Sequence, residues 1–330
     1  MNGDLNWHDG DRLIRFADRA LEAAPATLAD NGWDSYELFS TERALADAPD
    51  ALAGQAAGVY AVRSGAVNEI AAEQIGEVAS DHLVAFGGGR VIDTAKAVAA
   101  VTGARVAAIP TTLSGAEMTR IHKLPDGHKP QDGLNRPSLV IADPDAMTAQ
   151  PERERRASAM NALAHAADSL YTPLAHPVSR MAALEGSRLI AVGLEEERRR
   201  DLALGSLLAG YAIDTAKFSL HHVICQSLVR ILRIPHAETN AAILPRVIEA
   251  LLPRAPDEMA ELAKVLGSTP EDLAERIEAL SGGRRTLSEI GADAQRLDEA
   301  LDAIQARGEL EMTPATPDRD ELRRIIEIAW

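Results

Sequence analysis

The sequence has only one cysteine, Cys225, among its 330 residues. An internal disulfide needs two cysteines, so no disulfide framework holds this chain, and a single cysteine is typical of a reducing compartment. A secretion signal is not expected either, because the segment MNGDLNWHDGDRLIRF has acidic residues where a signal peptide has a basic end and an apolar run. These two features predict a cytoplasmic protein.

Long apolar runs and an excess of positive charge are also missing. Asp93, Lys96 and Arg105 interrupt the most apolar region, so no stretch approaches the roughly 20 apolar residues of a membrane span. The 50 acidic and 34 basic residues give a net charge of -16, and no basic stripe with interleaved aromatics is present. We therefore expect neither a membrane nor a nucleic-acid partner. An acidic small-molecule substrate would need a local cluster of Arg, Lys or His side chains.

Two kinds of pattern divide the chain near residue 150. Before it, short apolar runs alternate with helical segments, which is typical of a parallel sheet built from βαβ units. The predicted strands are residues 36–41, 56–64, 82–89, 105–112 and 138–144. Between the third and fourth strands, residues 90–103 have apolar residues at helical spacing and end on Gly103, which predicts a helix.

Beyond Pro151 the pattern changes to Ala- and Leu-rich stretches, which predict helices at residues 154–171, 201–232, 241–252 and 321–330. A chain of this length also exceeds the usual size of one domain. We therefore expect two domains. Residues 1–150 would form a Rossmann-like α/β domain with a parallel sheet, and residues 151–330 an all-α domain that carries the substrate site.

Three glycines, Gly87, Gly88 and Gly89, follow the third predicted strand. Without side chains there, the phosphates of a ligand could approach the backbone N–H groups at the start of the next helix, whose dipole adds to the attraction. Glycines are also common in plain tight turns between a strand and a helix. This glycine turn therefore predicts phosphate binding, with a structural turn as the alternative.

Polar residues near the glycine turn have two interpretations each. Thr111 and Thr112 end the next predicted strand, and the carboxyl ends of neighbouring parallel strands line one crevice where ligands bind. Their hydroxyls could contact the same nucleotide, or they could cap the next segment. Asp93 and Lys96, one helical turn apart, form either a surface ion pair or a pair that faces the nucleotide.

Histidines gather in the helical half. Asn161 and His165 are four residues apart and project from one face of a predicted helix, with Asp168 near that face. Three more histidines follow later in the chain: His221, His222 and His236. An isolated histidine on an Ala-rich helix is usually a satisfied interior group, but several on two facing helices favour a site. Three imidazoles and an amide could hold a divalent ion, although an amide oxygen brings no charge and is a poorer ligand than a carboxylate.

Six segments in chain order resemble the signatures of the iron-containing alcohol dehydrogenase and dehydroquinate synthase-like superfamily: AFGGGRVIDTAKAVA, AIPTTLSGAEMT, RPSLVIADP, SAMNALAHAADSLY, LHHVICQSL and IPHAETNAAILP. The resemblance covers most of the chain and is least over the first thirty residues. It implies the dehydroquinate synthase-like fold, oxidoreductase activity with NAD or NADP, and a homodimer. The variants MNALAHA, LHHVIC and IPHAE are most similar to maleylacetate reductases.

The same resemblance assigns roles to individual residues. It implies catalytic roles for His165, His222 and His236, and cofactor contacts at Gly87, Gly88, Gly89, Asp93, Thr111, Thr112 and Lys129. Members that use iron or zinc usually have aspartate at the position of Asn161, whereas maleylacetate reductases have asparagine there and work without a tightly held metal. An Fe or Zn ion is therefore compatible with this sequence but not required by it; if bound, its ligands would be Asn161, His165, His222 and His236.

The chain departs from the maleylacetate reductase pattern in two places, the segment 226–230 and Asp93. Gln226 occupies the position of a family histidine that is a candidate proton relay, and a glutamine amide cannot act as an acid or base near neutral pH. Val229 and Arg230 stand where the family has glycines. Asp93 matches the alcohol dehydrogenase pattern better than the maleylacetate one. The resemblance therefore leaves the substrate open.

Taken together, the sequence predicts an NAD(P)H-dependent, maleylacetate reductase-like enzyme that transfers a hydride to a small oxo or enoyl substrate. If the substrate is a dicarboxylate, Arg120 or Lys123 could pair with it, or both could lie in solvent. Arg43, in the segment 40–43, could admit the 2′-phosphate of NADP. The alternative is a metal-dependent dehydrogenase of a small alcohol or aldehyde. A nucleotide-binding protein without catalysis and a lyase are further alternatives from the same fold.

Overall fold

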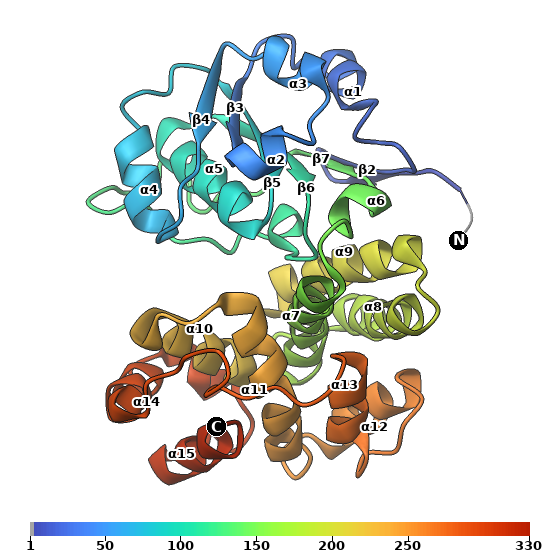
Figure 1. Cartoon of the computed structure of the whole chain (residues 1–330), viewed down its shortest axis with the longest axis vertical. Coiled ribbons are helices and arrows are strands. Elements are labelled where there is room, and N and C mark those ends of the chain that lie inside the picture. Colours follow the sequence, from blue (N-terminus) through green and yellow to red (C-terminus); the bar gives the residue numbers. More distant parts are fainter. Residues whose placement is uncertain (1–2) are drawn as a thin grey trace. The chain divides into compact units, whose positions relative to one another are not determined.

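The computed structural model describes residues 3–330 and divides into two compact units, Met1–Gln150 and Pro151–Trp330 (Figure 1). The first unit contains a sheet with helices on both faces, and the second is built from helices. This is the predicted fold class, which is confirmed. Each unit has a core of its own.

The sheet of the first unit has seven strands in the order β1-β2-β7-β6-β5-β3-β4. Their bounds are β1 (Leu5–Asp9), β2 (Arg12–Phe16), β3 (Glu37–Ser40), β4 (Gly58–Ala61), β5 (His82–Gly87), β6 (Arg105–Pro110) and β7 (Leu139–Ala142). All neighbouring strands are parallel except β1 and β2. The five predicted strands are all present, each a few residues shorter than its sequence run.

The β1–β2 hairpin is a feature that the sequence analysis did not predict. Its turn begins at Gly10, which has a φ of 64°, and β2 pairs in parallel with β7. Arg12 at the start of β2 is 2% exposed because its Nε donates to the carbonyl of Pro137 at 2.7 Å. The signal was present, since a Gly10-Asp11 pair between two short strand-like runs is a recognised two-residue hairpin turn.

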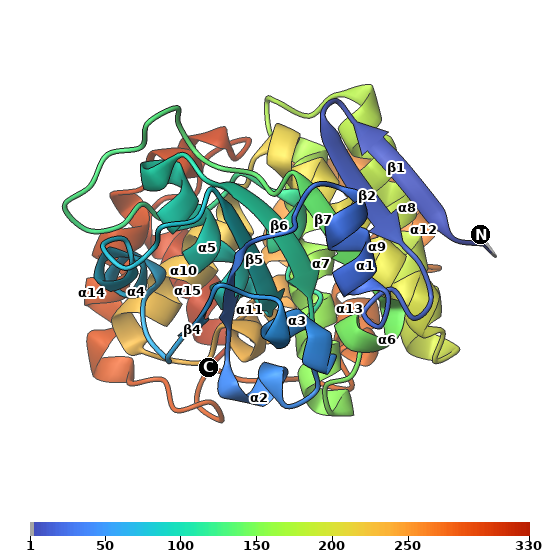
Figure 2. The ribbon, with the colours of Figure 1, turned by 90° about the horizontal axis from the view of Figure 1, so that it is seen from above.

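The two faces of the sheet carry separate hydrophobic cores. One core packs α1 (Ala24–Asp30) and α3 (Asp50–Gly54) on the sheet, and the other packs α4 (Val67–Gln74) and α5 (Gly89–Thr102) (Figure 2). Short helices α2 (Glu42–Leu45) and α6 (Pro144–Met147) lie in the connections. Helix α5 ends where the sequence predicts, because Gly103 adopts the left-handed conformation, with a φ of 80°, that a glycine takes at low cost.

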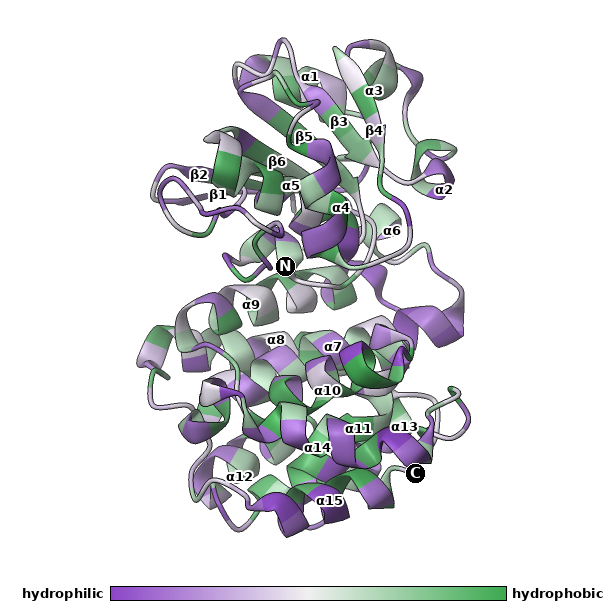
Figure 3. Cartoon of the chain, turned by 90° about the vertical axis from the view of Figure 1, so that its left-hand side faces the viewer, coloured by the Kyte–Doolittle hydropathy of each residue, from purple (hydrophilic) through white to green (hydrophobic). Residues whose placement is uncertain are grey.

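The second unit is formed by helices α7 to α15. Their bounds are α7 (Glu152–Tyr171), α8 (Pro177–Glu195), α9 (Arg199–Ala216), α10 (Leu220–Leu232), α11 (His236–Leu251), α12 (Pro256–Val265), α13 (Leu273–Leu280), α14 (Leu297–Gln305) and α15 (Arg319–Ile328). Helices α8 and α9 touch through backbone, since a Cβ on Gly193 would lie 2.6 Å from the nitrogen of Leu202. The final helix α15 buries Leu322, Ile325 and Ile326, while Ile328 and most of its charged residues lie at the surface; Figure 3 shows the apolar and polar residues alternating along it.

The predicted helical stretch of residues 201–232 is wrong in one respect, because it contains two helices. Helix α9 ends at Lys217, whose φ is 64°, and α10 begins at Leu220. Between them, the N–H of Ser219 donates to Asp168 of α7 at 3.1 Å rather than to a helical carbonyl. A buried carboxylate on another helix therefore sets the break, which no local pattern reveals.

No helix within residues 3–330 is long and apolar enough to cross a membrane.

Candidate functional site

The glycine turn lies where β5 meets α5. Gly88 is the N-cap of α5 and provides no side-chain cap to the first N–H groups of this 14-residue helix, of which that of Val91 donates to the carbonyl of Gly88 at 2.9 Å. A Cβ on Gly88 would lie 2.9 Å from Cγ2 of Thr112, and one on Gly89 would lie 2.9 Å from Cβ of Ser114. Side chains here would collide with the loop after β6, so the glycines let this loop approach the start of α5 closely. The turn therefore fits a phosphate group of a dinucleotide.

The sheet order places this turn at a topological switch point. From β3 the chain continues to the edge strand β4, whereas from β5 it continues to β6 on the opposite side. Ligands of open α/β sheets bind at the carboxyl ends of strands where this reversal occurs. Ser40, at the end of β3, is fully buried and its hydroxyl donates to the carbonyl of Phe86 at 2.7 Å. It is thus committed to the sheet, while Arg43 is exposed on α2.

The loop after β6 packs against the glycine turn. The Thr111 N–H donates to the carbonyl of Gly87 at 3.0 Å, and Thr112 lies against Gly88. The capping alternative for the two threonines is wrong, because the residue that precedes the short helix Ala116–Met118 is Gly115 and the hydroxyl of Ser114 accepts from the N–H of Ala116. Lys129 is exposed, in a loop that the Asn68–Asp126 hydrogen bond of 2.8 Å ties to α4.

Asp93 and Lys96 form an ion pair, but not on the surface. Lys96 is fully buried, with its Nζ 2.8 Å from Oδ1 of Asp93 and 2.9 Å and 3.0 Å from the carbonyls of Ala116 and Ile121. The expectation of a surface pair is therefore wrong, because Lys96 ties α5 to the loop after β6. Asp93 keeps a side chain that is 29% exposed and stays a predicted cofactor contact.

Glu117 lies beside this ion pair and is also fully buried. Among the described residues, neither of its carboxylate oxygens has a hydrogen-bond partner. Burial raises the pKa of Glu117 from 4.5 to about 7, and the charges of Lys96 and Arg12 offset part of that rise. A buried carboxyl group of this unit is therefore half neutral near physiological pH.

Replacing Glu117 by glutamine is expected to stabilise the protein at alkaline pH. The pKa of Glu117 in the folded state exceeds its unfolded value. The contribution of the neutral side chain to the free energy of unfolding is therefore fully present below about pH 4.5 and is lost as the pH rises through about 7. The loss amounts to about 3 kcal/mol, which a neutral glutamine avoids. Thermal unfolding at about pH 5 and about pH 8.5 measures it, with exposed Glu69→Gln as the control. An equal gain at both pH values would contradict the pKa assignment.

In the second unit the structure brings the predicted histidines together. The rings of His165 on α7 and His222 on α10 stack at a centroid distance of 4.8 Å and an angle of 14°. His236, the exposed first residue of α11, is close enough that its charge lowers the pKa of both. Asn161 is buried one turn before His165 on the same helix. We call His165, His222 and His236 the histidine cluster.

Asp168 holds His222 in place. Its Oδ2 lies 2.8 Å from Nδ1 of His222 and also accepts from the N–H of Ser219, while Oδ1 accepts from the hydroxyl of Tyr171. Because a carboxylate accepts hydrogen bonds, Nδ1 of His222 carries the proton and Nε2 presents a lone pair. Sequence reasoning placed Asp168 near this face of α7 without giving it a role. The spacing of three residues from His165 was the available signal.

His221 and His222 are adjacent in the chain but face different partners. His221 contacts Oδ1 of Asn240 through Nε2 at 2.8 Å, and the amide nitrogen of Asn240 is committed to the carbonyl of His236. Asn240 therefore offers only its oxygen to His221, so Nε2 of His221 carries the ring proton and donates to it. The ring of His221 faces α11, which carries Asn240. His221 is a buried structural histidine, which is the interpretation that isolated histidines favour.

Burial controls the ionisation of this site. It lowers the pKa of His222 to about 3, with the charges of His236 and Arg307 as further causes, and it lowers the pKa of His165 well below its usual range. Burial also raises the pKa of Asp168, and hydrogen bonds from Tyr171 and Ser219 oppose that rise. Both stacked imidazoles are thus neutral near pH 7. Among the described residues, Nδ1 of His165 and Nε2 of His222 have no hydrogen-bond partner.

The donors of the histidine cluster are arranged poorly for a metal ion. Within residues 3–330, no three His, Cys, Asp or Glu side chains are placed so that they could hold one. In the stacked arrangement, the imidazole planes of His165 and His222 lie nearly parallel, so their in-plane lone pairs do not converge on a common point. The arrangement therefore does not fit the predicted set of Asn161, His165, His222 and His236 as metal ligands.

Gln226, the main departure from the family pattern, lies one helical turn after His222 on α10. Its Oε1 accepts from Nη1 of Arg307 at 2.9 Å, and the guanidinium lies 5.6 Å from the ring centroid of Phe218. Phe218 in turn packs on His222 at 5.7 Å. The sequence analysis missed Arg307 and Phe218, because Arg307 is 81 residues from Gln226 and has no motif around it. The predicted cations Arg120 and Lys123 are exposed in the first unit.

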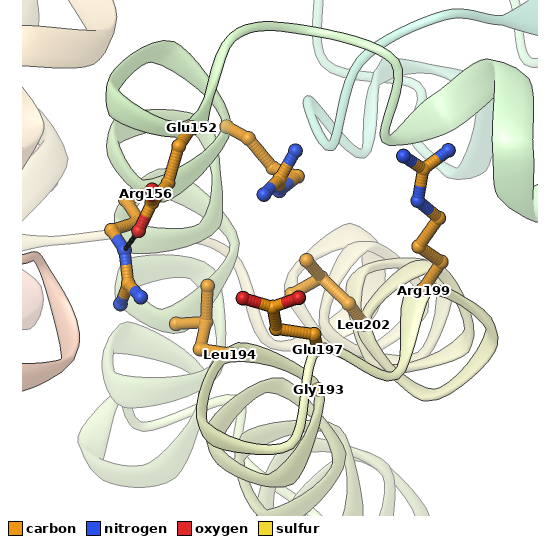
Figure 4. Close-up of a pocket in the computed structure, with 8 residues that line it drawn as sticks. Glu152, Arg156, Gly193, Leu194, Glu197, Arg199 and Leu202 are labelled. Atoms are coloured by element: carbon orange, nitrogen blue, oxygen red, sulfur yellow. Dashed lines mark hydrogen bonds and ion pairs between the residues drawn. The ribbon is translucent and has the colours of Figure 1, made fainter.

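A small hollow of the second unit lies away from the histidine cluster (Figure 4). It measures about 70 Å³ and is lined by Glu152, Arg155, Arg156, Gly193, Leu194, Glu197, Arg199 and Leu202. Its charged lining residues are three arginines and two glutamates, and Glu152 pairs with Arg156 at 2.8 Å. The hollow contains no residue with a predicted catalytic role.

Comparison with known proteins gives matches along almost the whole chain. The family profile described as iron-containing alcohol dehydrogenase matches residues 14–144, and that of the C-terminal part of the Fe-containing alcohol dehydrogenase family matches residues 156–330. A maleylacetate reductase of Burkholderia cepacia is 34% identical over 76% of this chain and 74% of its own length. Maleylacetate reductase 2 of Cupriavidus pinatubonensis is 33% identical over 100% of this chain and 98% of its own.

Solved structures similar to this chain in fold include members of the same family. The crystal structure of maleylacetate reductase from Rhizobium sp. strain MTP-10005 superposes with a TM-score of 0.83 at 27% identity, covering 100% of this chain and 99% of that one. An iron-containing alcohol dehydrogenase from Corynebacterium glutamicum has a TM-score of 0.84 at 27% identity, covering 98% and 97%. Both comparisons support the fold that the first and second units show separately.

Proposed function

The chain belongs to the iron-containing alcohol dehydrogenase family, and on that premise we propose that it reduces a small oxo or enoyl dicarboxylate in the manner of a maleylacetate reductase. Family membership confirms the resemblance seen in the sequence: the protein is an oxidoreductase that uses NAD or NADP and acts on a small molecule. The substrate class is supported by the two maleylacetate reductases, each above 30% identity over most of the chain.

The roles of the first unit follow from the glycine turn. Gly87, Gly88 and Gly89 leave the N–H groups at the start of α5 open to a pyrophosphate, and Thr111, Thr112 and Asp93 border that position. Lys129 is the remaining predicted contact. When bound, the reduced nicotinamide supplies the hydride. Arg43 is the candidate partner of a 2′-phosphate.

The observation that carries the proposed chemistry is the pair of unpartnered ring nitrogens in the stack of His165 and His222. Maleylacetate has a C=C bond conjugated to a ketone, so a hydride added to the C=C bond moves negative charge to the ketone oxygen. One proton must then reach the neighbouring carbon. We assign both tasks to the histidine cluster in its protonated form: Nε2 of His222 takes up a proton from solvent, and the resulting imidazolium, paired with Asp168, polarises that oxygen and then gives the proton to the carbon.

Asp168 is a positioning residue in this proposal. It fixes the tautomer of His222 and would stabilise the imidazolium that forms when Nε2 takes up a proton. Its own donors, the Tyr171 hydroxyl and the Ser219 N–H, hold the carboxylate still. The proposal derives no step through a metal, because the described donors do not fit one.

The test is oxidation of NADH and of NADPH by the purified protein with maleylacetate, run with and without a chelator. We expect turnover that the chelator does not change. Activity only with small alcohols or aldehydes, lost on chelation and accompanied by stoichiometric iron or zinc, would replace this proposal with the metal-dependent dehydrogenase. Cofactor binding without turnover on any carbonyl compound would favour a non-catalytic binder.

Two broader properties are also proposals. A homodimer is supported by the family resemblance, and a cytoplasmic location by the single cysteine and the acidic N-terminal segment. Size-exclusion chromatography with light scattering measures the first, with a mass of about twice one chain as the expected result.

A further inference from the structure

Arg307 is a cation that contacts the histidine cluster through the ring of Phe218, and neither the motifs nor the family resemblance marks it. It precedes the short helix Gly308–Met312, and its side chain is 22% exposed. The guanidinium lies over the ring of Phe218, which packs on His222, and its charge is one of the causes that lower the pKa of His222. All of these residues belong to the second unit.

The guanidinium of Arg307 donates three hydrogen bonds to two neighbouring side chains, Glu309 and Gln226. Its Nε and Nη2 donate to the two carboxylate oxygens of Glu309 at 3.2 Å and 2.8 Å, and its Nη1 donates to Oε1 of Gln226 at 2.9 Å. An arginine has five N–H groups, one on Nε and two on each terminal nitrogen. These three bonds therefore leave one N–H on Nη1 and one on Nη2. A planar carboxylate can accept two such N–H groups in parallel.

Gln226 explains why the cation can stay in this place. A histidine at this position would present a ring that can itself become protonated, and it would then repel a guanidinium. The glutamine amide has no charge at any pH and offers an oxygen as a fixed acceptor. The departure at residue 226 thus exchanges a group that can transfer a proton for a well-placed positive charge.

We propose that Arg307, positioned by Gln226 and Glu309, binds a carboxylate of the substrate beside Phe218, the ring that packs on His222. This inference rests on the proposed function and deepens it, because it makes the enzyme selective for substrates that bear a carboxylate near the reducible bond. In a protein with a net charge of -16, such a local cation is what an anionic substrate requires.

Arg307→Met tests the proposal, because methionine keeps an apolar side chain over Phe218 and removes the charge. We expect KM for maleylacetate to rise about 10- to 100-fold, the loss of one charge-assisted hydrogen-bonded pair, while KM for its uncharged dimethyl ester changes less than about twofold. Arg296→Met is the matched control, since Arg296 is a partly exposed arginine paired with Glu299 three residues away. An equal loss with both substrates, or an unchanged KM for maleylacetate, would overturn the carboxylate site.

A binding measurement separates this inference from the proposed reaction. Maleate, a dicarboxylate that is not itself the substrate, is titrated calorimetrically into the wild type and the Arg307→Met variant. Tighter binding to the wild type supports the site even if no turnover is found, whereas equal binding rejects the site even if maleylacetate is reduced.

Discussion

Replacing Asp168 by asparagine is expected to lower kcat by about 10²- to 10⁴-fold while the affinity for the dinucleotide stays within about twofold. Asp168 is fully buried and bonds Nδ1 of His222 at 2.8 Å. An asparagine amide can turn its NH₂ toward that nitrogen, which moves the ring proton to Nε2, and its neutral oxygen cannot stabilise an imidazolium. The loss should therefore appear in kcat rather than in cofactor binding.

Two further measurements distinguish this role of Asp168 from a merely structural one. Asp201→Asn removes the charge of another buried aspartate, one paired with Arg198, and should reduce thermal stability without a comparable loss of kcat. ¹⁵N NMR of the histidine rings should show Nδ1 of His222 protonated in the wild type and a changed tautomer in the variant. If Asp168→Asn lowers kcat only as much as Asp201→Asn, the positioning role fails.

The second large effect is expected at Gly88. Alanine there would bring a Cβ within 2.9 Å of Cγ2 of Thr112, so the glycine turn and the loop after β6 must move apart. Overpacking of this size costs about 1 to 3 kcal/mol, and we expect the Kd of NADH or NADPH to rise roughly 10- to 100-fold. Fluorescence titration of each dinucleotide measures the change and also decides which one the protein prefers.

Gly54→Ala is the matched control for that experiment. Gly54 ends α3, and a Cβ at this position would meet no heavy atom within 4 Å, so alanine should be accommodated with unchanged dinucleotide affinity. If Gly88→Ala unfolds at a lower temperature but binds the dinucleotide as tightly as the wild type, the glycines serve only the packing of the turn. The structural alternative that the sequence left open for them would then hold.

Local patterns predicted much of the fold. The five apolar runs became β3 to β7, and the helix that begins at the glycine turn ends at Gly103 as expected. These features depend on residues a few positions apart, such as an apolar period or a glycine with a left-handed φ. The hairpin of β1 and β2 carries a comparable local signal in its two-residue turn, Gly10-Asp11.

Some features of the site could likewise be predicted from the sequence, whereas others required the folded structure. The family, the glycine turn and the presence of histidines on two helices all follow from the sequence alone, because short motifs and helical spacing carry that information. The packing of the folded chain was needed to show that His222 rather than His221 meets Asp168, that Lys96 is buried, and that Arg307 reaches Gln226. The Asp168–His222 and Gln226–Arg307 contacts join residues 54 and 81 positions apart. Their partners depend on where α9 breaks at Lys217 and on how separate helices pack, which residue periodicity does not encode.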